Sequence, residues 1–251
     1  MPVNNILEKL HRGEKACGLT FIFPSEELIE LAGLAGFDFV FLDGEHGSFT
    51  TRTIESHCRT ADAVGLTTIA RVPNIESDTI LRFLDRGVLG IMGPHICTAD
   101  DAQKLADACR FVPEGKRSFG SGRGVGYGTP SPRADSMQQL NNQMLVMALL
   151  EDQAALDNLS EITRVDGIDF FSFGPNDLAQ SMGLPGEPDH PQVIKSMDQA
   201  TREIKASGKR MLDEVCATAR AAEMFLESGL SLIHISEPTR RTPISYAVFC
   251  L

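Results

Sequence analysis

The feature that most constrains the fold of this chain is the alternation of apolar, strand-like runs with segments of helical pattern. Strands are predicted at residues 16–23, 37–42, 66–70, 88–92, 144–150, 168–173 and 209–212. Helices are predicted at residues 24–34, 50–64, 77–86, 99–111, 134–142, 153–165, 191–207 and 217–228. This order predicts a parallel sheet, because parallel neighbours need a crossover connection that is usually a helix.

The number of strand–helix units favours a barrel. Seven units spread over about 230 residues suit an α/β fold of the (β/α)8 TIM barrel type better than an open doubly wound sheet. No Gly-x-Gly-x-x-Gly motif follows the first strand, which weakens the dinucleotide-binding alternative. Neither an internal repeat nor a linker divides the chain, so we expect a single domain.

Composition narrows the class of partner and compartment. The formal net charge of −11 argues against nucleic acid and anionic membrane surfaces as partners. No apolar run approaches the ~18 residues of a membrane span, and the N-terminal residues lack the apolar core of a signal peptide. The six cysteines are scattered singly, without the spacing of zinc ligands, which is typical of reduced thiols and predicts a cytoplasmic protein.

The last 22 residues, 230–251, are expected not to belong to the natural protein. Residues 230–240 and 244–251 match in-frame translations of two parts of a transposase-type sequencing adapter. We therefore expect the natural barrel domain to occupy residues 1–229. The barrel would be C-terminally truncated, with its eighth strand and helix missing or replaced. Residues 231–236 alternate well enough to imitate a strand.

Polar residues follow the predicted strands at the points where an active site would lie. In a barrel, residues just past the carboxyl ends of the strands face the active site. These residues are Asp43, Glu45, His46, Arg71, His95, Glu151 and Asp177. The set was chosen from strand ends alone, and it contains only acids, histidines and an arginine.

Each of these residues has a chemical and a structural interpretation. Glu151 and Asp177 would suit a hard divalent cation, or could be ordinary first-turn acids of the helices that follow them. Arg71 would bind a carboxylate or a developing oxyanion, or pair with a structural acid. His46 would transfer a proton, or be a loop histidine. His95, beside Pro94, is interpreted as structural.

The segment 113–132 interrupts the alternation of strands and helices. It contains six glycines with Lys116, Arg117 and Arg123 between them. A loop of this length in a compact domain is usually functional or disordered. It lacks the Gly-Lys-Ser/Thr ending of a P-loop, so phosphate binding is weakly indicated.

At these residues the chain resembles the HpcH/HpaI aldolase/citrate lyase family, whose members include class II, metal-dependent pyruvate aldolases. The matching segments lie in the family order and cover nearly all of residues 1–229. They are Leu-Asp-Gly-Glu-His at 42–46, Arg-Val-Pro at 71–73, Phe-Leu-Asp-Arg-Gly at 83–87, Pro-Glu-Gly-Lys-Arg at 113–117 and Gly-Pro-Asn-Asp-Leu at 174–178. Two features depart from the family pattern: Leu149 stands where a glutamine is usual, and the loop 120–124 is richer in glycine.

The resemblance implies roles for individual residues. Glu151 and Asp177 would hold Mg²⁺, Mn²⁺ or Co²⁺, and His46 would be the base. Asp85 would support that histidine from a neighbouring subunit of a trimer or hexamer. The resemblance further implies that Arg71 holds the oxygens of pyruvate, and that Asp43, Gly174 and Pro175 also contribute to substrate binding.

The implied reaction is the formation or cleavage of a 4-hydroxy-2-oxo acid, with pyruvate and an aldehyde as the other partners, through a pyruvate enolate that the metal stabilises as a Lewis acid. A second interpretation is a lyase or decarboxylase that acts on a related 2-oxo or acyl-thioester acid. A third is that the truncated chain is inactive, because a barrel without its last unit exposes unpaired strand edges.

Overall fold

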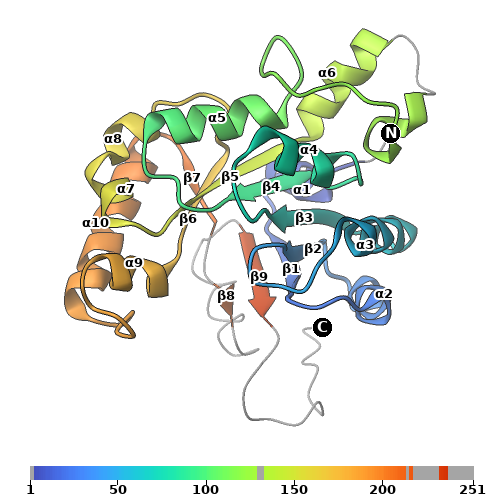
Figure 1. The fold of residues 1–251 in the computed structure, drawn as a ribbon. Coiled ribbons are helices and arrows are strands. Elements are labelled where there is room, and N and C mark those ends of the chain that lie inside the picture. The colour runs from blue at the N-terminus through green and yellow to red at the C-terminus, as the bar shows by residue number, and fades with distance from the viewer. Residues whose placement is uncertain (1–2, 129–132, 213–214, 217–231, 237–251) are drawn as a thin grey trace.

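A curled sheet of parallel strands forms the centre of the protein (Figure 1). The computed structural model describes residues 3–128, 133–212, 215–216 and 232–236. The strands are β1 (Ala16–Phe21), β2 (Phe39–Asp43), β3 (Thr67–Arg71), β4 (Gly90–Gly93), β5 (Leu145–Leu150), β6 (Phe170–Phe173), β7 (Arg210–Met211), β8 (Val215–Cys216) and β9 (Leu232–Ser236). Strands β1 to β7 lie in chain order, and β9 and then β8 continue the sheet beyond β1.

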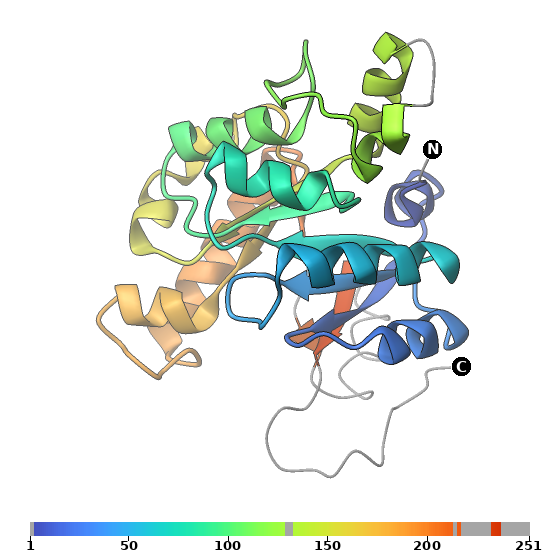
Figure 2. The same ribbon diagram turned by 45° about the vertical axis from the view of Figure 1, so that its right-hand side comes forward.

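Helices cover the outside of the sheet and connect its strands. They are α1 (Asn5–His11), α2 (Glu26–Leu34), α3 (Thr51–Ala63), α4 (Ser77–Leu84), α5 (Ala99–Cys109), α6 (Arg133–Gln143), α7 (Gln153–Asp157), α8 (Leu159–Ile162), α9 (Pro175–Ser181) and α10 (Pro191–Ala206). Figure 2 shows α2 and α3, in blue, side by side on the outer face. Capping boxes at Thr50 and Thr98 begin α3 and α5, where the sequence placed helix starts.

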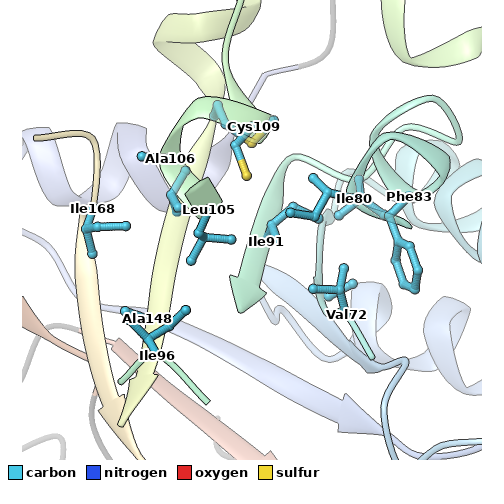
Figure 3. Close-up of a cluster of buried hydrophobic side chains, with 14 of the residues drawn as sticks. Val72, Ile80, Phe83, Ile91, Ile96, Leu105, Ala106, Cys109, Ala148 and Ile168 are labelled. Atoms are coloured by element: carbon cyan, nitrogen blue, oxygen red, sulfur yellow. The ribbon is translucent and has the colours of Figure 1, made fainter. Parts of the chain in front are cut away.

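Successive residues of each central strand enter two different apolar clusters. In β2, Phe39 and Phe41 belong to an inner cluster, while Val40 and Leu42 belong to an outer cluster under the helices. The same alternation holds for β3, β4, β5 and β6. Figure 3 shows the outer cluster where α4 and α5 pack on the strands. Burial of both faces is why these strands are continuously apolar in sequence.

Helix α1 closes the amino end of the sheet and was not predicted. The side chains of Ile6, Leu7 and Leu10 on this helix pack with the inner cluster. Asn4 caps the helix and donates from Nδ2 to the carbonyl of Leu89, just before β4. The opposite, carboxyl end of the sheet carries the polar residues.

The predicted barrel is confirmed as a curled α/β sheet, but not as a closed barrel. Among the described strands, no ladder joins β7 to β8, so the sheet stays open there. The segment that was expected only to imitate a strand is β9, and Ala16 to Thr20 of β1 pair with Leu232 to Ser236. The predicted helix 217–228 lies outside the described residues, and the predicted helix 153–165 is divided at Asn158 into α7 and α8.

Two further features concern membrane-spanning helices and disulfide bonds. None of the helices in the described part of the chain is long and apolar enough to cross a membrane. Cys17, Cys58, Cys97 and Cys109 are not in disulfide bonds.

Candidate active site

The carboxyl ends of neighbouring strands bring the predicted residues together. Asp43 and Arg71 are the last residues of β2 and β3 and stand opposite each other in the ladder. By the alternation described above, both lie on the same face as the inner cluster. Glu151 follows β5 with the same parity as Leu145, Met147 and Leu149. The inner apolar cluster is therefore the floor of a polar site.

Arg71 is fixed by a bidentate pair with Asp43. Its Nε donates to Oδ1 at 3.0 Å and its Nη2 to Oδ2 at 2.6 Å. Nη1 lies 3.2 Å from Oε2 of Glu45. A guanidinium has five N–H donors, so some remain for a substrate oxyanion.

The acids around Arg71 define its electrostatics. Burial alone would lower the pKa of Arg71, but Asp43, Glu45 and Glu151 together raise it above its usual value. Burial would raise the pKa of Asp43, but Arg71 and the backbone N–H groups of Glu45 and His46 hold it below its usual range. Both oxygens of Asp43 thus accept hydrogen bonds within the protein. The role of Asp43 in the site is therefore to orient Arg71.

Glu151 is a buried carboxylate with little compensation. Burial raises its pKa, and the hydrogen bond from the backbone N–H of His95 to Oε1, at 2.9 Å, offsets this only in part. Its Oε2 faces Gly174, where a Cβ atom would lie only 2.5 Å away. Glycine at this position therefore lets the start of α9, which carries Asp177 in its first turn, approach Glu151.

His95, which the strand-end rule also selected, lies among the acids. Its Nδ1 is 3.0 Å from Oδ2 of Asp152 and 3.4 Å from Oε1 of Glu151, and its Nε2 is 3.9 Å from Oε1 of Glu45. Partial burial would lower the pKa of His95, but Asp152 and Glu151 raise it above its ordinary value. The signal in the sequence was its place directly after the fourth predicted strand, the same rule that selected Glu151.

His46 and Asp85 are not brought together within one chain. His46 is exposed in the turn after β2, at the carboxyl end of the sheet. Asp85 is the C-cap of α4, which runs back from the carboxyl end of β3 toward the amino ends of the strands. Any support of His46 by Asp85 would have to come from another copy of the chain, as the resemblance implies, and it stays a prediction.

The glycine-rich loop packs on the end of α4 and leaves the carboxyl-end site to other segments. A Cβ at Gly124 would lie 2.0 Å from the carbonyl oxygen of Leu84, and the N–H of Gly124 donates to the carbonyl of Asp85. Arg123 pairs with Asp62 and donates to the carbonyl of Arg86. Glycine is therefore needed at position 124 for this close approach.

A divalent cation fits the two carboxylates expected to bind it. No group of three or more His, Cys, Asp or Glu side chains gathers into a ready metal site within the described ranges. Glu151 is nevertheless a buried, poorly compensated carboxylate next to the helix that carries Asp177, and hard cations take such oxygen ligands together with water and substrate. The support for a cation site therefore comes from the carboxylate oxygens that Glu151 and Asp177 offer, and not from a complete set of ligands already gathered in the structure.

The fold and the rim of charged residues define a barrel-type enzyme site. Residues 22–237 match the family HpcH/HpaI aldolase/citrate lyase, and the chain belongs to this family.

Relatives and solved structures agree. A 4-hydroxy-2-oxovalerate aldolase from Rhodococcus jostii is 32% identical over 83% of this chain and 80% of its own length. A 2-keto-3-deoxy-L-rhamnonate aldolase from Shigella sonnei is 32% identical over 82% of this chain and 77% of its own. The crystal structure of an HpcH/HpaI aldolase from Desulfitobacterium hafniense superposes with a TM-score of 0.83, at 26% identity, covering 92% of this chain and 90% of that one. The predicted family and the predicted class, a carbon–carbon lyase, are confirmed.

Proposed function

We propose that this chain makes or cleaves a 4-hydroxy-2-oxo acid, with pyruvate and an aldehyde as the other partners. The observation that carries the proposal is Arg71, held by Asp43 with N–H donors to spare, beside the buried carboxylate of Glu151. The names of the relatives, both aldolases that act on 2-oxo acids, support this substrate class.

In the cleavage direction the bond between C3 and C4 breaks. A base takes the proton of the C4 hydroxyl, the aldehyde leaves, and the bonding electrons pass to C3 and the C2 oxygen as a pyruvate enolate. A proton then returns to C3 and completes the methyl group of pyruvate. Arg71 is placed to hold the oxo-acid oxygens and to stabilise the negative charge that develops on them.

His46 is the proposed proton carrier. It is exposed at the turn that Asp43 organises by accepting the N–H groups of Glu45 and His46. Asp85 of a neighbouring copy would support it in a trimer or hexamer. Gly174 and Pro175, at the start of α9, would border the bound substrate.

Glu151 and Asp177 would hold Mg²⁺, Mn²⁺ or Co²⁺, which supplies Lewis-acid stabilisation of the oxo oxygen when it is bound. A cation would stabilise the ionised form of Glu151, because burial of its carboxylate is offset only in part by the neighbouring groups that the structure describes. A cytoplasmic location belongs to the same proposal.

The decisive assay measures pyruvate release from 4-hydroxy-2-oxo acids by the complete chain before and after EDTA treatment. We expect activity to disappear with EDTA and to return with Mg²⁺, Mn²⁺ or Co²⁺. Undiminished cleavage in EDTA would contradict the metal-dependent reaction. Cleavage of acyl thioesters without pyruvate release would favour the alternative lyase, and absence of both activities would favour an inactive chain.

A further inference from the structure

His95 has a backbone conformation that its neighbours must enforce. It follows β4 and Pro94 with φ of +51°, in the left-handed region that residues other than glycine rarely adopt. Such a conformation persists only where the surrounding structure over-determines it, and it is concentrated at functional sites.

The contacts of His95 explain what this conformation achieves. Its backbone N–H points at Oε1 of Glu151 at 2.9 Å, while Nδ1 lies 3.4 Å from the same oxygen. Nδ1 is also within 3.0 Å of Oδ2 of Asp152, which follows Glu151 in the chain. The main chain and the ring of one residue therefore converge on the two successive acids after β5.

The consequence for Glu151 is a fixed orientation. Its Oε1 is engaged by His95, so Oε2 is the oxygen that faces Gly174 and the first turn of α9. On the inner side, Nε2 of His95 is 3.9 Å from Oε1 of Glu45, an acid that itself contacts Arg71. His95 thus links the β2 and β5 sides of the site.

We infer that His95 is a positioning residue that holds Glu151 with Oε2 directed toward the start of α9, the helix that carries Asp177, ready to bind a cation. This inference rests on the proposed function for the role of Glu151. It gives the histidine a role that the strand-end rule alone does not assign. Substitution of the partners that orient metal ligands typically weakens metal affinity by about 10- to 100-fold.

Three substitutions separate the contributions of the main chain and the ring. His95→Asn keeps a polar side chain and tolerates positive φ. His95→Gly keeps the N–H and relieves the backbone strain, but removes the imidazole. His95→Val removes the imidazole, and its β-branched side chain opposes positive φ and so displaces the N–H as well.

The measurement is the dissociation constant of Mn²⁺ for the complete chain, by isothermal titration calorimetry. We expect about ten-fold weaker binding for His95→Gly, weaker still for His95→Val, and recovery to within about three-fold for His95→Asn. His11→Val, at an exposed position on α1, is the control and should bind Mn²⁺ like the unsubstituted chain. Because His95→Gly removes strain, it should melt no earlier than the unsubstituted protein, and it carries the test if His95→Val does not fold.

Each other outcome has a distinct meaning. Unchanged affinity in His95→Gly and His95→Val, with loss of binding in Glu151→Gln, overturns the positioning role and leaves the proposed function standing. No Mn²⁺ binding by the unsubstituted chain overturns both. Complete loss of binding in His95→Asn and His95→Gly, equal to Glu151→Gln, would make His95 a ligand itself and would also overturn the positioning role.

Discussion

Two arginines with little solvent exposure, Arg71 and Arg117, lie at opposite ends of the sheet and have different surroundings. Arg71, at the carboxyl end, has a side chain that is 16% exposed and is held by both oxygens of Asp43. Arg117, after α5 at the amino end, is 2% exposed, and its nearest carboxylate oxygen, on Asp85, is 3.7 Å away. Within the described part of the chain, Nε and Nη2 of Arg117 and Oδ1 of Asp85 have no hydrogen-bond partner.

The difference shows in the direction of the pKa shifts. Neighbouring carboxylates raise the pKa of Arg71 despite its burial, whereas burial lowers the pKa of Arg117. Arg117 is compensated by the ring of Phe111, whose centroid lies 4.6 Å from Cζ. The pair of Arg71 with Asp43 is thus saturated and preorganised for binding, whereas the described residues at the amino end leave the guanidinium of Arg117 without a comparable ion pair.

The largest effect is expected from breaking the saturated pair at its acid. Asp43→Ala removes the bidentate pair and leaves the largely buried Arg71 with the weaker influence of Glu45 and Glu151. Removal of one partner of a buried pair costs about 3 kcal/mol of unfolding free energy. Urea unfolding at pH 7 measures this loss. Glu14→Ala, in an exposed pair with Arg12, is the control and should leave the unfolding midpoint unchanged.

The same pair predicts a pH dependence. The folded-state pKa of Asp43 is lowered, so its stabilising contribution is fully present above the unfolded-state pKa. It is lost as the pH falls through the lowered folded-state value. The difference in stability between the unsubstituted chain and Asp43→Ala should therefore shrink on acidification, and a constant difference would show that the charge of Asp43 is not the cause.

Arg71→Lys tests function at the same network. A lysine cannot reproduce the fork that faces both oxygens of Asp43, and it presents fewer directed donors to an oxyanion. We expect kcat/KM for pyruvate release to fall by about 10² to 10³. Arg82→Lys, on the exposed face of α4, should retain full activity. An Arg71→Lys enzyme within three-fold of the unsubstituted rate would rule out oxyanion stabilisation by this residue.

The residues of this carboxyl-end site could be predicted from the sequence, but most of the contacts between them could not. Asp43, Arg71 and Glu151 were found from strand ends, because the carboxyl ends of parallel strands must meet at one edge. The pairing of Arg71 with Asp43 was open, since the sequence allowed either a substrate or a structural acid as its partner. Local sequence does not determine the close approach of Gly174 to Glu151 or the positive φ of His95. Both depend on how β4, β5 and β6 are aligned side by side in the sheet. For the same reason, α1 and the packing of the glycine-rich loop went unpredicted.

Glu151→Gln sharpens the comparison by removing a buried charge at the functional end that its neighbours compensate only in part. In metal-free buffer the neutral amide avoids the burial cost that raises the pKa of Glu151, so the variant should be more stable, on the order of 1 kcal/mol. A thermal melt in EDTA measures this gain. With excess Mn²⁺ the order should reverse, because only the unsubstituted chain gains stability from binding the ion. Identical melting temperatures in both buffers would argue against Glu151 as a metal ligand.

The smallest effect is expected at the other arginine. Arg117→Met removes a guanidinium whose Nε and Nη2 lack hydrogen bonds, and it fills the same space with apolar atoms. It also loses the contact with Phe111, worth about 1 kcal/mol, so the two changes nearly cancel and the unfolding midpoint in urea should move little. A loss comparable to that of Asp43→Ala would mean that the 3.7 Å pair with Asp85 stabilises the fold as strongly as the bidentate pair does. The contrast between the two ends would then lie in geometry alone and not in energy.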